Sequence, residues 1–313
     1  MIYQHPLAYL LGLEGVALLR AFAGDHDRAF TEARIAEIRR LLDDPALAGE
    51  GELVERMDIV DAYRIWSATY DGEPRNGLFD LDEPILHEIL DKLPAGVALD
   101  AACGTGRFAE HLASRGHQVI GVDSSPDMLA RAQRRVPDGD FRLGPLARLP
   151  LDDDQVDVVV CTLALTHVAA LAPVFAEFAR VLLPGGHLVI SDVHYALADL
   201  GAIAKAVAPD GERGLLPVYR HRASDYLGAA LPLGLRVRRC EEPRFWFTEE
   251  PKPMPADITV GPWPDWPWSL INLAPAAASA AGNGVPAIIV WHFQLDGQAA
   301  ATLHHGTGTG AGT

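Results

Sequence analysis

Two short segments, 99–106 and 119–123, constrain the fold more than any other part of this sequence. The first, Leu-Asp-Ala-Ala-Cys-Gly-Thr-Gly, closes an apolar run at 96–99 and leads into a helix-like stretch at 108–114. The second, Val-Ile-Gly-Val-Asp, is another apolar run and ends in Asp123. A strand, a glycine turn, a helix and a second strand ending in an acid form a nucleoside-binding crevice, because a carboxylate accepts hydrogen bonds from both ribose hydroxyls.

The glycine spacing alone leaves two kinds of cofactor open. The segment Gly-Thr-Gly-Arg-Phe-Ala at 104–109 also fits the G-x-G-x-x-G/A pattern of dinucleotide sites. Asp100 argues against a dinucleotide, because its charge would repel a pyrophosphate and would favour a cationic amino-acid group. Met128 follows Asp123 closely and places an apolar thioether where an adenine face is expected.

A third motif, Leu-Leu-Pro-Gly-Gly at 182–186, precedes the apolar run 187–190. Together, Asp-x-x-x-Gly-x-Gly at 100–106, Val-Asp-x-Ser-Pro-x-Met-Leu at 122–129 and this motif resemble the class I S-adenosylmethionine-dependent methyltransferases, in their Rossmann-like, small-molecule form. The resemblance extends over roughly 63–293. It implies that S-adenosylmethionine is the cofactor and S-adenosylhomocysteine the product.

Alternating apolar runs and helical patterns predict an α/β fold. The expected architecture is a seven-stranded Rossmann-like sheet, mostly parallel with an antiparallel last strand, together with an N-terminal helical cap. The early runs are apolar throughout, as expected of parallel strands covered on both faces. Strands are predicted near 96–102, 117–122, 139–143, 155–161, 186–193, 233–240 and 287–295, and helices near 81–93, 106–115, 125–135, 170–181 and 222–230.

The domain prediction follows the composition of the remaining segments. Residues 6–42 are rich in helical patterns, with a second helix beginning near 27. The tail has no apolar content to pack and is expected to be disordered. The predicted parts are an N-terminal cap at 1–50, a linker and cofactor-covering segment at 51–80, a core at 81–297 with substrate-covering insertions at 196–221 and 243–286, and the tail at 298–313.

The overall charge limits the partners. A formal net charge of −16 disfavours nucleic acid, which such a surface would repel. The start of the chain lacks a basic signal region, and no apolar run of 18 residues is expected, so neither secretion nor membrane insertion is predicted. The three cysteines, Cys103, Cys161 and Cys240, are expected to be reduced and buried, which favours a cytoplasmic protein. A homodimer through the N-terminal helices stays open beside simple packing.

The resemblance implies roles for the cofactor-binding residues. Asp123 would accept hydrogen bonds from the ribose, and Tyr70 would bind the methionine carboxylate. Asp100 has a structural alternative, capping of the turn, and Met128 is also a natural core residue. The predicted cofactor contacts are Tyr70, Asp100, Ala102, Gly104, Gly106, Asp123, Ser124, Met128, Leu146 and Thr162.

One departure from the family pattern lies at the exit of the third strand. Pro145 stands where the family often has the acid that receives the adenine amino group. The backbone N–H of Leu146 is the remaining group that could meet the adenine ring, so weaker or different adenine binding is expected.

Polar residues near the strand ends are candidates for the acceptor side. His167 and His194 are predicted proton acceptors, since a histidine pKa lies near neutrality. His167 stands where the resembled family often has a histidine, which many of its members keep without using it as a base, and loop packing is the alternative for His194. The predicted substrate contacts are Trp66, Leu163, His221, Trp246 and Trp263, with core packing the alternative for Trp66 and a rigid covering loop the alternative for the tryptophan-rich insertion. No metal site is predicted, because the acidic run 152–154 fits a solvated turn.

The predicted function is transfer of a methyl group from S-adenosylmethionine to a small aromatic or hydrophobic molecule, such as an indole or phenol of secondary metabolism. The transfer would be an in-line displacement with a histidine assisting deprotonation. A catalytically silent cofactor-binding or regulatory protein is one alternative. An NAD-dependent oxidoreductase using Gly104, Gly106 and Asp123 is another, against which Asp100 and the Pro-Gly-Gly motif argue.

Overall fold

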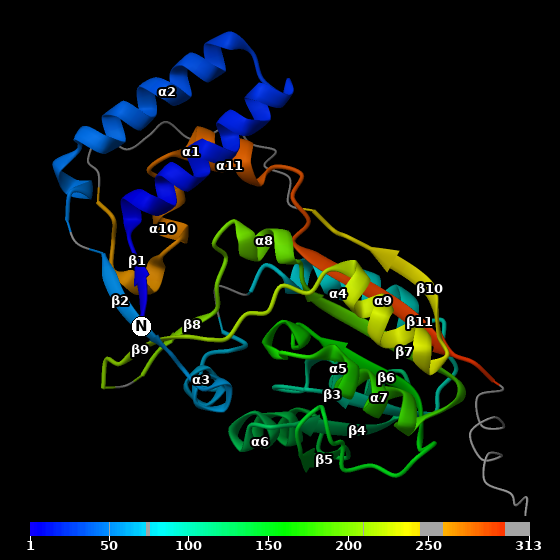
Figure 1. The fold of residues 1–313 in the computed structure, drawn as a ribbon. Helices are drawn as coiled ribbons and strands as arrows, with labels where there is room; N and C mark the ends of the chain where they lie inside the picture. The colour runs from blue at the N-terminus through cyan, green and yellow to red at the C-terminus, as the bar shows by residue number, and fades with distance from the viewer. Residues whose placement is uncertain (50, 73–75, 209, 245–258, 298–313) are drawn as a thin grey trace, which may run out of the picture. The chain divides into compact units, whose positions relative to one another are not determined.

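The computed structural model describes residues 1–49, 51–72, 76–208, 210–244 and 259–297 (Figure 1). The chain divides into two compact units. The first unit comprises 1–70, 193–220 and 242–289, and the second comprises 71–192, 221–241 and 290–313. Both insertions predicted from the sequence contribute to the first unit.

A seven-stranded sheet forms the centre of the second unit, in the order β10-β11-β7-β6-β3-β4-β5. Neighbours from β7 to β5 pair in parallel, whereas β10 and β11 are antiparallel. The predicted fold class is confirmed, including the antiparallel arrangement of the last strand. The strands are Val97–Ala101 (β3), Gln118–Asp123 (β4), Asp140–Leu143 (β5), Val156–Thr162 (β6), Leu182–Val193 (β7), Leu235–Glu241 (β10) and Ile288–Leu295 (β11).

The central strands and the helices beside them follow the sequence pattern. In β6, the β-branched run Val158, Val159 and Val160 is almost completely buried, as a parallel strand with two covered faces requires. Helix α6 begins at Pro126, whose fixed φ suits a first helical position, after the capping residue Ser125. The helices of this unit are Phe79–Leu90 (α4), Arg107–Ser114 (α5), Pro126–Arg135 (α6), Leu171–Val181 (α7) and Ala223–Ala230 (α9), each close to its predicted range.

The strand register brings several carboxyl ends to one edge of the sheet. Ala101 of β3 lies opposite Val122 of β4 and Cys161 of β6, and Thr162 of β6 lies opposite Ser191 of β7. Residues directly after these strands therefore share one edge, which is where open parallel sheets bind ligands.

The first unit combines helices with a second, four-stranded sheet in the order β1-β2-β9-β8. Leu10, Leu13 and Ala17 of α1 belong to its apolar core, together with Trp263 and Ala277. Figure 1 shows α1 and α2 side by side in blue. The elements are Ile2–Gln4 (β1), Pro6–Ala23 (α1), Arg28–Asp43 (α2), Glu52–Arg56 (β2), Ile59–Trp66 (α3), Tyr195–Asp199 (α8), Lys205–Val207 (β8), Arg213–Leu215 (β9), Trp268–Ile271 (α10) and Pro275–Gly282 (α11).

The sequence did not predict this small sheet. Three of its strands have only three residues, which is too short for an alternating pattern to stand out. Its partners also come from distant segments, since β1 pairs with β2 and β2 pairs with β9. The segment expected to be a linker and covering segment thus contributes a strand, β2, and a helix, α3.

Two expectations are wrong: that the chain has no apolar run of 18 residues, and that all three cysteines are buried. Helix α1 has 18 residues and is apolar enough by composition to cross a membrane, although a core helix passes the same test. This helix carries Glu14, fully buried and paired with Arg34 of α2 at 2.9 Å, which is a contact within the protein core. Cys240 is exposed, because it lies on an outward position of β10, whereas Cys103 and Cys161 are buried as expected.

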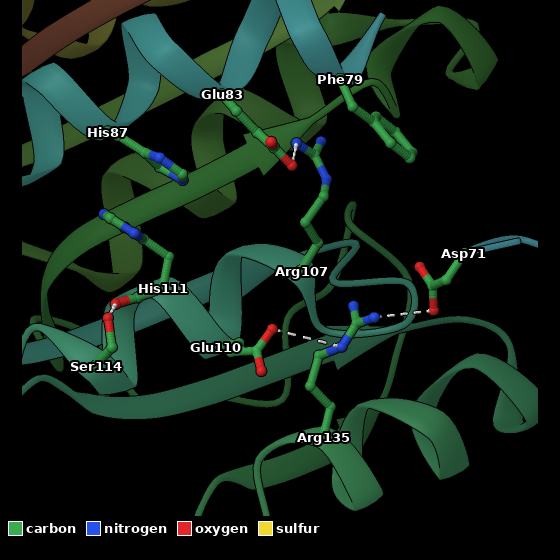
Figure 2. A pocket seen from close by; sticks show the side chains of 9 residues that line it. All are labelled: Asp71, Phe79, Glu83, His87, Arg107, Glu110, His111, Ser114 and Arg135. Carbon is green, nitrogen blue, oxygen red and sulfur yellow. Dashed lines mark hydrogen bonds and ion pairs between the residues drawn. The ribbon is translucent and has the colours of Figure 1, made fainter. Parts of the chain in front are cut away.

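A buried ion pair joins α4, α5 and β7. Arg107 binds Asp82 through two hydrogen bonds of 2.8 and 3.0 Å, and the Ser191 hydroxyl donates to the same carboxylate at 2.9 Å. Asp82 is 0% exposed. The guanidinium also lies 4.1 Å from the centre of the Phe79 ring and donates to Glu83 (Figure 2). Arg107 therefore neutralises a carboxylate that has no access to water.

Replacing this arginine should be costly. Arg107→Met leaves the Asp82 carboxylate buried with only a hydroxyl donor, and we expect the free energy of unfolding to fall by about 3–5 kcal/mol. Arg142→Met removes a more exposed pair with Asp140 and should cost less than about 1 kcal/mol. Urea denaturation of both variants measures the difference, and equal losses would show that Asp82 is not held mainly by Arg107.

Candidate functional site

A strained turn follows β3 at the carboxyl edge of the second unit's sheet. Ala102, Gly104 and Gly106 all have left-handed backbones, with φ of 57°, 52° and 84°. The turn is tied to β4, since the Cys103 N–H donates to the Val122 carbonyl at 3.0 Å. A non-glycine residue in this conformation, such as Ala102, is uncommon and often marks a functional turn.

The two glycines of the turn serve different purposes. A Cβ atom at Gly106 would lie 3.0 Å from the Cα of Ala132, so this glycine permits α5 and α6 to pack closely. A Cβ atom at Gly104 would meet no described heavy atom within 4 Å. The backbone at Gly104 is therefore open to the approach of a ligand.

Asp123, at the end of β4, holds the turn in place. Its two carboxylate oxygens accept hydrogen bonds from the N–H groups of Gly104 at 2.9 Å and Ser125 at 2.8 Å. Burial raises the pKa of this carboxyl, and the backbone donors partly oppose the shift. Asp123 thus connects the glycine turn, the end of β4 and the start of α6.

Asp100 lies beneath the turn, inside β3. It is 1% exposed, and its Oδ2 atom accepts a hydrogen bond from the Ala109 N–H at 2.8 Å. Ala109 is in the first turn of α5, so the observed contact is the capping role that was the alternative for Asp100. Burial raises the pKa of Asp100 to about 7.

The residues predicted to contact adenine have different environments. Ser124 is exposed directly after β4, and Leu146 is half-buried after β5. The Gly144 N–H donates to the Asp123 carbonyl at 3.0 Å, which keeps the ends of these strands adjacent. Met128 is 0% exposed and packs as a core residue, in agreement with its structural alternative.

Two further predicted residues lie at or directly after the end of β6, which lies on the other side of β3 from β4. Thr162 is half-buried, and Leu163 has a left-handed backbone with φ of 52°. The Leu163 N–H donates to the Ser191 carbonyl at 2.7 Å, which fixes this unusual conformation against β7.

His167 ends a short 3-10 helix, Leu165–His167, that follows β6. The position of this helix is fixed by Asp192, which is fully buried. Asp192 accepts hydrogen bonds from the Thr166 N–H at 3.0 Å and from the Tyr226 hydroxyl at 2.6 Å. The sequence did not assign these contacts, because Tyr226 is distant in the chain and lies on α9.

The other two candidate histidines, His221 and His194, form hydrogen bonds with backbone groups of the protein. Nε2 of His221 donates to the carbonyl of Val168 at 2.7 Å, and Val168 is the residue directly after His167. His194, in the first unit, accepts the Ala196 N–H through Nδ1 at 3.2 Å and so caps α8. Its Nε2 lies 3.4 Å from Glu242, and burial lowers its pKa. This arrangement favours the loop-packing alternative for His194.

The aromatic candidates belong mainly to the first unit. The Tyr63 ring lies 5.2 Å from that of Trp66 and 6.0 Å from that of Tyr70. Trp263 is 1% exposed, and its indole N–H donates to Gln4 at 2.7 Å. Trp263 is therefore a core residue here, which fits the covering-loop alternative, and Trp246 lies outside the described residues.

A connection not predicted from the sequence anchors the chain after Tyr70. Asp71 accepts hydrogen bonds from the Thr105 hydroxyl at 2.8 Å and pairs with Arg135 at 3.0 Å. Thr105 is the middle residue of the glycine turn. Figure 2 shows Arg135 directed at Asp71, beside a hollow of about 410 Å³ that contains none of the predicted cofactor residues.

The second unit thus gathers most of the predicted cofactor contacts, and the first unit holds several predicted acceptor contacts. Predicted residues in the second unit are Asp100, Ala102, Gly104, Gly106, Asp123, Ser124, Met128, Leu146, Thr162, Leu163, His167 and His221, and those described in the first unit are Trp66, Tyr70, His194 and Trp263.

Comparison with known proteins finds methyltransferases that resemble part of this chain. Residues 99–190 match the methyltransferase domain family. The chain is 36% identical over 118 residues to malonyl-[acyl-carrier protein] O-methyltransferase of Yersinia pestis, covering 37% of this chain and 43% of that protein. It is 38% identical over 100 residues to demethylmenaquinone methyltransferase of Renibacterium salmoninarum, covering 32% and 42%. The chain thus spans less than half the length of these relatives.

A solved structure, the DhpI–SAH complex, shares the fold with a TM-score of 0.50 at 19% identity, covering 76% of this chain and 95% of that one. The family match confirms the resemblance predicted from the three motifs, and with it S-adenosylmethionine as the cofactor of the family.

The raised pKa of Asp100 predicts a pH effect on stability. Its folded pKa, about 7, exceeds the ordinary value of 3.8, so its contribution to stability is complete below pH 3.8 and is lost as pH rises through 7. Asp100→Asn keeps a carbonyl oxygen for Ala109 and cannot ionise. We expect the variant to gain stability relative to wild type as pH increases from 5 to 8, by at most about 1.4 kcal/mol per pH unit.

Urea denaturation of both proteins across this pH range measures the effect. Asp127→Asn, at an exposed position of α6, is the matched control and should follow the wild-type profile. Parallel profiles for wild type and Asp100→Asn would contradict the assignment of a buried, proton-binding carboxyl.

Proposed function

We propose that this chain, which belongs through residues 99–190 to the class I S-adenosylmethionine-dependent methyltransferases, transfers a methyl group to a small aromatic or hydrophobic molecule. The observation that carries the proposal is Asp123, pinned at the end of β4 beside the open backbone of Gly104. A fixed carboxylate next to an open glycine turn suits a nucleoside with a polar amino-acid tail.

The residues present fit the donor, which when bound supplies an electrophilic methyl group on a cationic sulfur. The N–H groups of Gly104 and Ser125 donate to different oxygens of Asp123, and the lone pairs that remain on this carboxylate are the proposed acceptors for the ribose hydroxyls. Asp100 places a titratable carboxyl beneath the turn, and a cationic amino group nearby would favour its ionised form. Tyr70 precedes the anchored residue Asp71 and is the proposed contact for the methionine carboxylate.

His167 is the proposed proton acceptor on the acceptor side. The buried carboxylate of Asp192 holds the backbone of the preceding residue, Thr166, so the 3-10 helix that carries His167 is fixed at the edge of the sheet. Thr162 and Leu163 come from the same strand end and are proposed to lie near the reacting methyl group. His194 is the weaker candidate, because its Nδ1 atom already caps α8.

The acceptor class rests on charge and on the relatives. A net charge of −16 argues against a nucleic acid. The two relatives are named for malonyl-[acyl-carrier protein] and for demethylmenaquinone, and neither name refers to a nucleic acid. A cytoplasmic enzyme of natural-product biosynthesis is the form of the proposal that we favour over a silent cofactor-binding protein.

The first test is calorimetric titration with S-adenosylhomocysteine. Asp123→Ala should weaken binding by about 1–3 kcal/mol, since two charge-assisted hydrogen bonds are lost. Asp123→Asn preserves the side-chain shape and guards against a disturbed turn, and Asp127→Ala, at an exposed position of α6, should leave the affinity unchanged. Wild-type affinity in both Asp123 variants would remove the assignment, and binding of NAD instead would favour an oxidoreductase.

The second test uses turnover. Incubation with S-adenosylmethionine and a panel of indoles and phenols should yield a methylated product by mass spectrometry. His167→Gln should lower kcat by about 10²–10⁴-fold, the usual contribution of general acid–base catalysis, and leave the affinity for S-adenosylhomocysteine unchanged. Unaltered kcat would mean that water takes the proton, and donor binding without any methylated product would favour the silent protein.

A further inference from the structure

The first unit contains a hollow of about 370 Å³ that the preceding sections do not use. Four separate segments line it: β1 with the start of α1, helix α8 with the residues after it, Arg220, and the Trp266–Pro267 turn with the following helix α10. A smaller, mainly apolar cavity of about 70 Å³ shares Tyr9 and Pro267 with it. The volume of the hollow lies at the lower end of the range for small-molecule sites.

The walls of the hollow combine aromatic and proline rings with polar side chains. Trp266 donates its indole N–H to the Val260 carbonyl at 2.9 Å, so its polar atom is occupied within the protein. The Tyr9 ring lies against Gly201, where a Cβ atom would come within 2.8 Å of it. Gly201 also has a left-handed backbone, with φ of 84°, so both its conformation and its contact with Tyr9 require glycine. Two aromatic rings and a proline ring suit a planar apolar ligand.

The polar groups of the hollow give such a ligand an orientation. Asp199 pairs with Arg220 at 2.6 Å, and the two side chains are 53% and 52% exposed. Arg220 occupies Oδ1 of Asp199, so Oδ2 is the atom available to an N–H or O–H donor. The Tyr9 hydroxyl donates to no described residue, and burial raises its pKa to about 12. A hydroxyl that stays protonated is a hydrogen-bond donor for a ligand.

We propose that this hollow binds a small, flat aromatic molecule that carries an N–H or O–H group on one edge. The aromatic face contacts Trp266 and Pro267, and the polar edge is recognised by Asp199 and Tyr9. The identification of this molecule as the methyl acceptor rests on the proposed function, whereas the binding site itself does not.

Calorimetric titration with indole tests the site. Wild-type protein should bind indole more tightly than cyclohexanol, which is similar in size but not flat, and more tightly than 1-methylindole, which lacks the N–H donor. Ala8→Trp fills the hollow from an exposed position on α1 and should raise the Kd for indole by about tenfold or more. Ala36→Trp, on the exposed face of α2, is the matched control and should have no effect.

A second variant and a second ligand separate the possible outcomes. Asp199→Asn should reduce the preference for indole over 1-methylindole without unfolding the protein, because Asp199 is half-exposed. Titration of the same variants with S-adenosylhomocysteine tests the proposed function independently, and its Kd should not change in any of them. Failure of indole to bind, or equal indole binding by wild type and Ala8→Trp, would overturn the site even where S-adenosylhomocysteine binds normally.

Discussion

Carboxylates at the carboxyl edge of the second unit's sheet hold the loops that make up the candidate site. Asp123 accepts backbone N–H groups from the glycine turn and from α6, and Asp100 accepts one from α5. Asp192 accepts one from the short helix that carries His167. Leaving a buried N–H without a partner is costly, so each acid both fixes a loop and gives it its shape. The loops of the proposed donor site are thus held by hydrogen bonds within the protein itself.

Much of this arrangement could be predicted from the sequence, because its signals are local. The central strands β3, β4 and β6 are mainly apolar runs, and the turns after β3 and β4 carry glycine or an acid at a short spacing. Asp123 and the glycines 104 and 106 therefore appear where the motif places them. The sequence allows two roles for Asp100, since an acid in that position can face a ligand or cap the turn, and the structure shows it accepting the Ala109 N–H.

The remaining features depend on contacts between distant segments, which single-sequence patterns do not contain. Tyr226 reaches Asp192 from α9, and Arg135 reaches Asp71 from α6. The small sheet pairs strands of three to five residues from separate parts of the chain. His194 illustrates the same limit: its position after a strand resembles a catalytic one, but the N–H of Ala196, two residues later, turns it into a helix cap.

The two units also differ in how their chemistry is encoded. The family match spans 99–190. It ends just before residue 193, where the second of the three segments that form the first unit begins. The motif residues of the proposed donor site, among them Asp100, Gly104 and Asp123, thus lie in one contiguous stretch, where motif spacing carries the information. The hollow in the first unit is lined by the N-terminal segment, by the insertion at 196–221 and by the turn at Trp266–Pro267, so no single stretch of the sequence specifies it. This difference explains why the motifs of the sequence suggest a donor but do not suggest an acceptor.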